Sequence, residues 1–435
     1  MAITGGYADN LMRTQFGNSL EWIPNTGDPI LSKLTDRSNE WDGQGDEFLD
    51  PVLLSLSQSG GSTSRGGYLF EPMRPVADNL VITQKYGNAA FSLLEEEIDE
   101  TKTKKGAVID AIGLAMQNVE ELLMQDAGRQ AHGDGRGQLC QVNGAVAAAG
   151  TSIVLDNPGG PAGAVGGARF IRANMVIAAF DPTDTTFLGM IKCLAVPEVA
   201  NFTTITVEPL TFALPDNAVL YKGVSMTATD PVRSVTRNKE AMGLRGMLSN
   251  TGTYFGLNRA LFPQLSAIVM PGVGPLSDDL LQQAFAHMRA NSKKAVISKS
   301  DVFLTGDYSM GRALLSLTVA QRRYTMDSKN SRDPGSDTSG GDVHQTVGGF
   351  DFCESPNADY GTLSFVNKNG FSTVGRKGRW LDRSGSMFSR LDDAGQRTTE
   401  VVADWHYSFQ RWHKNPRSCV AMQGVALNQV VLRQF

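Results

Sequence analysis

One long amphipathic segment, residues 107–131, constrains the fold of this chain more than any other feature. Apolar residues recur along it at spacings of three and four, the period of one face of an α-helix. The stripe includes Val108, Ile112, Ala115, Val119 and Leu122. At 1.5 Å per residue the helix would extend about 37 Å, roughly twice the usual length in a globular domain. The pattern predicts a helical strut whose apolar face packs against another element.

A glycine-rich turn follows the predicted helix. Gly133, Gly135 and Gly137 alternate with Asp134 and Arg136, and this alternation disfavours continued helix. A phosphate-binding loop is an alternative interpretation, but such loops precede a helix so that its N-terminal amides face the anion. Here the glycines come after the helix. The sequence therefore predicts a helix stop that leads into a new domain.

Composition narrows the class of protein. The chain has 435 residues, of which 41% are hydrophobic and 20% charged, as in a globular protein of two or three domains. No uninterrupted apolar run approaches the eighteen residues of a membrane span, and the first residues lack the pattern of a secretion signal. We therefore expect no membrane association and a cytoplasmic site of synthesis. The formal net charge of −5 argues against a protein that grips nucleic acid through a basic surface.

Patterns typical of catalysis, cofactor binding or metal binding are missing from the sequence. It contains no Gly-x-Ser-x-Gly elbow, no His-Glu-x-x-His motif and no P-loop lysine. His406 and His413 lie seven residues apart in a strand-like run, which predicts opposite faces and no shared metal. The cysteines have no paired spacing, and we expect buried free thiols at Cys140, Cys193, Cys353 and Cys419.

Consecutive segments of the chain differ in apolar periodicity and in glycine content, and therefore predict different structures. Residues 1–59 have few periodic apolar positions and predict an extended arm that needs neighbours for burial. Residues 60–96 combine a glycine-rich hinge with strand-like runs at 68–73 and 80–86, and predict a protruding two-stranded loop. Residues 150–222 predict a small antiparallel barrel or sandwich. A helix capped by Ser277, a strand at 301–305 and a helix over 308–321 precede the closing strands.

This order of elements resembles the major capsid protein of tailed bacteriophages, which has the Hong Kong 97 fold. The resemblance is carried best by residues 120–142, where a helix with Leu122, Leu123 and Asp126 runs into the Gly-Asp-Gly element. The stretches GLRGML, GTYFG and FP within residues 243–263 provide a second match. The resemblance implies an α+β fold made of an N-terminal arm (1–59), an extended loop (60–96), a peripheral domain with a spine helix (97–149), a β-rich inserted domain (150–222), an axial domain (223–385) and C-terminal strands of the peripheral domain (386–435).

The resemblance also implies a function. It predicts a structural protein whose copies form the hexamers and pentamers of an icosahedral shell around packaged double-stranded DNA, held non-specifically. Portal, scaffolding and decoration proteins are the implied partners, with assembly in the host cytoplasm and a final place in the virion capsid. The shell of a bacterial protein nanocompartment, similar to encapsulins, is the alternative with the same fold. An enzyme is the alternative from a different class.

Two sets of residues carry these expectations. The structural set is Val108, Ile112, Val119, Leu122, Gly133, Gly135 and Gly137, and the set expected in an intersubunit loop is Tyr68, Phe70 and Lys85. Some members of the family crosslink a lysine to an asparagine of another subunit. Lys85 is the only lysine within residues 60–96, but the sequence identifies no partner for it. No catalytic, cofactor-binding or metal-binding residue is predicted.

Overall fold

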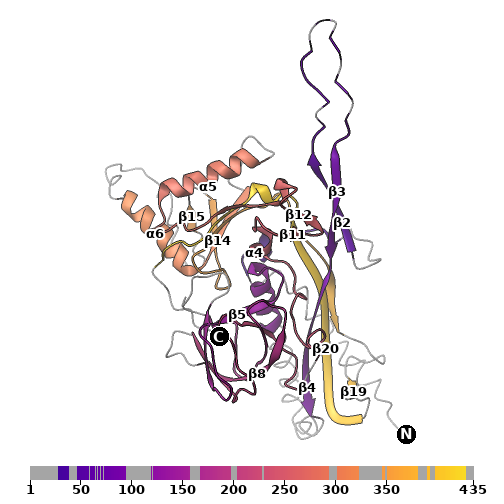
Figure 1. The fold of residues 1–435 in the computed structure, drawn as a ribbon, viewed down its shortest axis with the longest axis vertical. Coiled ribbons are helices and arrows are strands. Elements are labelled where there is room, and N and C mark those ends of the chain that lie inside the picture. The colour runs from indigo at the N-terminus through magenta and orange to yellow at the C-terminus, as the bar shows by residue number, and fades with distance from the viewer. Residues whose placement is uncertain are drawn as a thin grey trace, which may run out of the picture.

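The computed structural model of the chain describes residues 28–38, 47–94, 119–156, 167–196, 203–227, 230–292, 301–322, 345–347, 350–380, 389–391 and 397–427, apart from the single positions 58, 64, 66, 69, 72 and 120. Within these ranges, strands outnumber helices. They form two sheets, a closed barrel, a long projecting hairpin and one short hairpin (Figure 1).

The first sheet is organised around the long strand β20 (Arg397–His413). β4 (Lys85–Leu94), β18 (Phe371–Trp380) and β19 (Ser389–Leu391) all pair antiparallel with it, and β1 (Thr35–Asp36) runs parallel to β18. The pairing of β4 with β20 joins strands more than 300 residues apart in the chain, so this sheet ties the N-terminal and C-terminal parts of the molecule together. The 3₁₀ helix η2 (Leu31–Lys33) lies just before β1.

The predicted long helix is described only in its C-terminal part, which is helical over residues 121–132. Val108, Ile112 and Ala115 lie outside the described residues. The described part packs close to β20, because Arg411 on that strand donates a hydrogen bond of 3.4 Å to the carbonyl oxygen of Ala127. Ala127 and Ala131 also form a small buried cluster with Leu31. The helix ends at His132, and the glycine-rich turn leads directly into the barrel.

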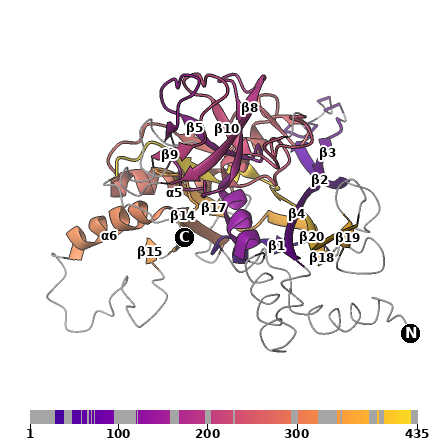
Figure 2. The same cartoon turned by 90° about the horizontal axis from the view of Figure 1, so that it is seen from below.

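The barrel is closed by six antiparallel strands in the order β10, β5, β6, β9, β8 and β7. Their bounds are β5 (Gln138–Val142), β6 (Ser152–Asp156), β7 (Val176–Phe180), β8 (Phe187–Ala195), β9 (Thr204–Val207) and β10 (Val219–Lys222). Alternate side chains fill its interior, among them Ile153, Ile177 and Leu220. Figures 1 and 2 both show the barrel as a separate lobe beside the sheets. Closure leaves no free sheet edge within it.

The second sheet has six strands in the order β13, β21, β17, β14, β16 and β15. Their bounds are β13 (Ile268–Met270), β14 (Val302–Gly306), β15 (Gln345–Val347), β16 (Phe350–Glu354), β17 (Leu363–Asn367) and β21 (Val420–Met422). Helices α5 (Asp278–Asn291) and α6 (Tyr308–Arg322) bury apolar residues against it. The hydroxyl of Ser277 accepts a bond from the amide of Leu280, so the predicted N-cap of α5 is confirmed. The 3₁₀ helix η7 (Pro416–Ser418) precedes β21.

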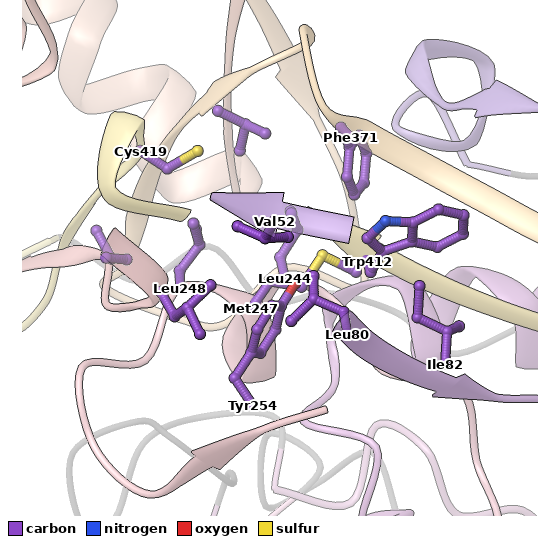
Figure 3. Packing of buried hydrophobic residues seen from close by; sticks show 14 of the residues in the cluster. Val52, Leu80, Ile82, Leu244, Met247, Leu248, Tyr254, Phe371, Trp412 and Cys419 are labelled. Carbon is purple, nitrogen blue, oxygen red and sulfur yellow. The ribbon is translucent and has the colours of Figure 1, made fainter. Parts of the chain in front are cut away.

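The projecting hairpin consists of β2 (Glu47–Ser55) and β3 (Val76–Thr83), paired antiparallel. Its inner side belongs to the largest apolar core of the described residues, which Figure 3 shows around Val52, Leu80 and Trp412. Helix α4 (Leu244–Met247), the 3₁₀ helix η5 (Pro263–Leu265) and the short hairpin of β11 (Thr253–Tyr254) and β12 (Leu257–Asn258) complete this core.

The strands of the projecting hairpin are not the two that the sequence predicts for the extended loop. The predicted run at 68–73 contains no described strand, and the actual partner of β3 is β2, which was assigned to the N-terminal arm. The tip residues include Pro75, which has no amide hydrogen for a ladder. β2 was missed because Pro51 and Asp50 interrupt its pattern, although an outer strand tolerates proline.

Three strands also lie outside the domains expected for them. β5, placed before residue 150, is a barrel strand, because the barrel closes only when β5 fills the gap between β10 and β6. β18, assigned to the axial segment, pairs with β20 in the first sheet. β21, assigned to the peripheral strands, lies in the second sheet between β13 and β17. Each sheet takes strands from separate parts of the chain, so a division into consecutive domains does not match the two sheets.

All four cysteines are free and buried in the structure, as predicted. Among the described residues, no helix is both long and apolar enough to cross a membrane.

Candidate assembly site

The two faces of the projecting hairpin have opposite environments. Side chains of β2 alternate between buried and exposed along its whole length, as the period of a strand requires. Phe48, Val52 and Leu54 point into the core, whereas Leu49 is 54% exposed and Leu53 is 48% exposed. Both exposed leucines lie on the outer face, where Leu53 is paired in register with Ala77. The outer face therefore presents two leucines that are only about half covered within the described part of the chain.

A buried carboxylate fixes the base of the hairpin to the first sheet. Asp50 lies on the inner face of β2 and is fully buried. Its Oδ2 atom accepts bonds from the indole Nε1 of Trp412 (2.9 Å) and from Nη1 of Arg37 (3.2 Å), and its Oδ1 atom accepts a bond from Nζ of Lys414 (2.8 Å). Burial alone would raise the pKa of Asp50, but the bonds from Lys414 and Trp412 and the charges of Lys414 and Arg37 lower it overall. The carboxylate stays charged and links the base of the hairpin to Trp412, Arg37 and Lys414.

The tip of the hairpin carries exposed aromatic and apolar side chains. Tyr68 is fully exposed, and Phe70 and Met73 are about half exposed. Figure 1 shows that the tip projects far beyond the sheets and the barrel. Tyr68 and Phe70 thus lie in the predicted loop and are available to other molecules.

Lys85 does not share this location. It is the first residue of β4 and is paired in register with Phe409 of β20. Its Nζ atom donates a bond of 3.0 Å to the carbonyl oxygen of Asn238, and burial lowers the pKa of this amine. The lysine is part of the first sheet and not of the projecting tip, so its expected place in the extended loop is wrong.

The end of the spine helix forms a packed junction with the chain that leaves the barrel. Arg129 on the helix contacts Asp126 (Nη2–Oδ1, 2.8 Å) and Glu240 (Nη2–Oε1, 2.5 Å). Burial alone would lower the pKa of the Arg129 guanidinium, but the charges and hydrogen bonds of Glu240 and Asp126 raise it above its usual value. Gln130 adds a bond from its Nε2 to Asp126 (2.8 Å). The helix and the segment around Glu240 therefore form one unit.

The glycines of the turn fit closely into this junction. Gly135 and Gly137 have φ angles of +84° and +82°, which favour glycine. A Cβ atom at Gly137 would lie 2.9 Å from the carbonyl oxygen of Thr236. Gly133 has no positive φ, and a Cβ atom there would meet only ordinary contacts. Two of the three predicted structural glycines thus have a conformational reason to be glycine.

Val119 and Leu122 differ in their surroundings, although the sequence places both on one stripe. Val119 is 4% exposed. Leu122 is only partly buried and lines a groove of about 580 Å³ between the helix and the barrel. Met175 and Phe170 from the barrel side form the opposite apolar wall, and Arg172 lies at the exposed rim.

Arg169 attaches the barrel to the second sheet. Its Nη1 atom donates a bond of 2.8 Å to the carbonyl oxygen of Ala358, and its Nη2 atom lies 3.8 Å from Oδ1 of Asp359. Asp359 also contacts Arg245, at 3.6 Å. Burial lowers the pKa of Arg169 to about 10, and Asp359 partly offsets that effect. Ion pairs and hydrogen bonds of Arg129 on the helix side and of Arg169 on the barrel side therefore hold the two walls of the groove in place.

The most informative of these residues were not found by sequence reasoning. Asp50 could have been found, because the period-two pattern of residues 47–55 places it among Phe48, Val52 and Leu54. Arg129 and Glu240 are 111 positions apart, and no local signal connects them. Among the described residues, no group of three or more histidine, cysteine, aspartate or glutamate side chains is arranged to hold a metal ion.

Comparison with known proteins gives matches in structure only. No family model and no curated protein matches the sequence. The chain is similar to a protein of the cyanophage A-1(L) capsid asymmetric unit, with a TM-score of 0.52, 12% identity and 94% of each chain covered. Two other likenesses have lower TM-scores. For the capsid of an empty GTA particle the TM-score is 0.44, with 8% identity over 94% of this chain and 92% of the other. For a protein of Mycobacterium phage Bobi the TM-score is 0.42, with 9% identity over 98% of this chain and 100% of the other.

The cyanophage likeness extends over nearly the whole of both chains. The chain therefore has the fold of a phage capsid protein, and the expected Hong Kong 97-type α+β fold is confirmed. At 12% identity the likeness establishes the fold, and the function is argued from the surfaces described above.

Proposed function

We propose that this chain is the major capsid protein of a tailed bacteriophage, and that many copies assemble into an icosahedral shell around packaged double-stranded DNA. The observation that carries the proposal is the projecting hairpin. One of its faces is anchored in the core at Asp50, while Leu49, Leu53 and Tyr68 remain exposed in the single chain. Exposed apolar surface on a projecting element marks contact with other proteins, and closed symmetric assembly covers such surface with identical copies.

The fold supports the same conclusion. The cyanophage A-1(L) protein is part of a capsid asymmetric unit, and a shared fold over 94% of each chain favours a shell role here. Such a role is structural and not enzymatic. It includes hexamers and pentamers of this chain, portal, scaffolding and decoration proteins as partners, and non-specific contact with the packaged DNA. Assembly takes place in the host cytoplasm, and the product is the virion capsid.

Electron microscopy of the purified protein tests the proposal. We expect closed shells of uniform diameter in negative stain and a fast-sedimenting species. The yield should rise with moderate salt, because each copy carries a formal charge of −5 and a Debye length of about 10 Å at 0.1 M screens repulsion between copies. Monomers alone at every protein and salt concentration would contradict the proposal.

The cargo distinguishes the phage shell from a nanocompartment with the same fold. Particles isolated from cells that carry the gene in its natural context should absorb more strongly at 260 nm than at 280 nm, because they enclose DNA. Particles with the absorbance ratio of pure protein, together with a second co-purifying protein, would favour the nanocompartment.

A further inference from the structure

The sequence contains two Asn-Gly pairs, Asn143–Gly144 and Asn369–Gly370. Such a pair is prone to deamidation, because glycine has no side chain to hinder the attack of its own backbone nitrogen on the side-chain amide of the asparagine. Both asparagines are exposed, and both glycines have positive φ angles, +83° and +115°. Exposure and the sign of φ therefore do not distinguish the two pairs, but their hydrogen bonds do.

The pair Asn143–Gly144 is bound to carboxylates at both reacting groups. The side-chain Nδ2 atom of Asn143 donates a bond of 3.0 Å to Oδ1 of Asp156. The backbone nitrogen of Gly144 donates a bond of 2.7 Å to Oδ1 of Asp216. Hydrogen bonds to a charged acceptor are about twice as strong as neutral ones. Both bonds must break before the nitrogen of Gly144 can reach the side-chain carbon of Asn143, so this pair is protected.

The pair Asn369–Gly370 has neither restraint. The backbone amide of Asn369 donates a bond of 3.0 Å to Oδ1 of Asn367, which leaves the side chain of Asn369 unaffected. Within the described part of the chain, the side-chain amide of Asn369 and the backbone nitrogen of Gly370 make no hydrogen bond. Both reacting groups can therefore approach each other without the loss of a contact.

The second pair lies where the chain passes from one sheet to the other. It forms the turn between β17 of the second sheet and β18 of the first sheet, and the amide of Phe371 closes this turn with a bond of 3.1 Å to the carbonyl oxygen of Lys368. The amide of Lys368 also donates to the carbonyl oxygen of Asp301 (2.8 Å), and that of Lys414 donates to the carbonyl oxygen of Gly370 (2.9 Å). A change in backbone length here would alter the link between the two sheets.

We propose that Asn369 is a site of spontaneous deamidation and that Asn143 is protected from it. The backbone nitrogen of Gly370 bonds to Cγ of Asn369, the Cγ–Nδ2 bond breaks, and the proton lost by the attacking nitrogen leaves with Nδ2 as ammonia. Water then opens the cyclic imide. Opening at Cγ gives aspartate, and opening at the main-chain carbonyl gives isoaspartate, which lengthens the backbone of the turn by a methylene group.

Peptide mapping by mass spectrometry tests the choice of site. The purified subunit is incubated at mildly alkaline pH and digested with pepsin at acidic pH, which limits further imide formation during the digest. We expect conversion at Asn369 at least about tenfold faster than at Asn143, because two bonds to carboxylates restrain the latter. The variant Asn369→Gln should lose the fast conversion. Equal rates at the two sites, or faster conversion at Asn143, would overturn the proposal.

Removal of one restraint tests why Asn143 is protected. Asp216 is exposed, so Asp216→Ala should keep the fold, which circular dichroism checks. This variant should deamidate at Asn143 at least about threefold faster than the unaltered chain, with no change at Asn369. Asp78→Ala, which removes an exposed carboxylate from β3, is the control and should change neither rate. An unchanged rate at Asn143 in the folded Asp216→Ala subunit would contradict protection by hydrogen bonds.

Storage of the subunit tests the consequence for the link between the sheets. The thermal midpoint of the unaltered chain should fall as isoaspartate accumulates at residue 369, and Asn369→Gln should slow this fall. Asn143→Gln is the matched control and should leave the fall unchanged. Loss of stability at the same rate in Asn369→Gln and in the unaltered chain would show that the modification does not weaken the link. Because the reaction needs only the subunit and water, all three experiments are independent of whether the chain forms shells.

Discussion

The indole Nε1 of Trp412 donates a hydrogen bond of 2.9 Å to the buried carboxylate of Asp50, and this contact joins the projecting hairpin to the longest strand of the first sheet. Arg37 lies against the same pair, with its guanidinium carbon 5.4 Å from the centre of the Phe48 ring and 5.5 Å from that of Trp412. The base of the hairpin is therefore attached to the first sheet by a buried hydrogen bond and by contacts between Arg37 and two aromatic rings.

Replacement of Asp50 by alanine should destabilise the subunit strongly. The substitution leaves Trp412 Nε1 without its acceptor and leaves Lys414 and Arg37 without their counter-charge. We expect a loss of about 3 kcal/mol in the free energy of unfolding, as for other broken buried ion pairs, measured by urea denaturation of the subunit. Asp78→Ala on the exposed part of β3 is the control and should cost less than about 0.5 kcal/mol. Equal losses in the two variants would show that Asp50 does not fix the hairpin.

Gly137→Ala and Gly144→Ala separate backbone strain from steric contact. The two glycines have nearly equal φ angles, +82° and +83°, so an added Cβ strains both backbones by about 1 kcal/mol. At Gly137 the Cβ also lies 2.9 Å from Thr236 O, whereas nothing lies within 4 Å at Gly144. Gly137→Ala should therefore lower the unfolding free energy by at least about 1 kcal/mol more than Gly144→Ala. Thermal and urea denaturation measure this difference, and its absence would mean that the junction relaxes around the new methyl group.

Much of the fold followed from local pattern in the sequence. The helix stop at Gly133, the N-cap of α5 at Ser277 and the strand β14 depend on residues close in the chain, and periodicity or turn chemistry reveals them. The barrel was expected as a small strand-rich unit for the same reason. β5 was missed because its membership depends on its partners β6, which lies 13 to 15 residues away in the paired positions, and β10, which lies about 80 residues away.

The polar contacts of the candidate site were less accessible to sequence reasoning. Asp50, Trp412 and Lys414 meet across more than 350 positions, and Arg129 meets Glu240 across 111. Such pairs arise from tertiary packing and leave no spacing rule in a single sequence. The apolar stripe of the helix correctly predicts that Val119 is buried. It could not predict that Leu122 lines a groove between the helix and the barrel.

Aspartate substitutions at Val119 and Leu122 should differ in how much they destabilise the subunit. Val119→Asp places a carboxylate in a buried apolar site and should cost more than about 3 kcal/mol, enough to prevent accumulation of soluble subunit. Leu122 faces the open groove, where water can reach the new carboxylate, so Leu122→Asp should leave a folded subunit that has lost about 1 kcal/mol. Circular dichroism and urea denaturation of both variants measure the contrast. A folded Val119→Asp subunit of normal stability would show that this helix is not the spine of the fold.

The acid stability of the subunit should depend on Asp28. Its buried carboxylate accepts bonds from Ser355 Oγ (2.6 Å), Asn357 Nδ2 (3.1 Å) and the amide of Ile30 (3.1 Å), and Oδ2 lies 3.4 Å from Nε2 of His132. Burial alone would raise the pKa of Asp28, but the charge of His132 and the bonds from Ser355 and Ile30 lower it from 3.8 to about 2.

A carboxylate with a lowered pKa in the folded state stabilises that state above its unfolded pKa, and this contribution disappears as the pH falls through the folded value. The subunit should therefore lose about 2 kcal/mol through Asp28 between about pH 5 and pH 2. Asp28→Asn cannot titrate, so its unfolding free energy should be lower at pH 7 and should fall less steeply over the same interval. Urea denaturation of both proteins at half-unit steps measures the two slopes. Parallel slopes would show that Asp28 is not the group whose protonation weakens the junction between the spine helix and the second sheet.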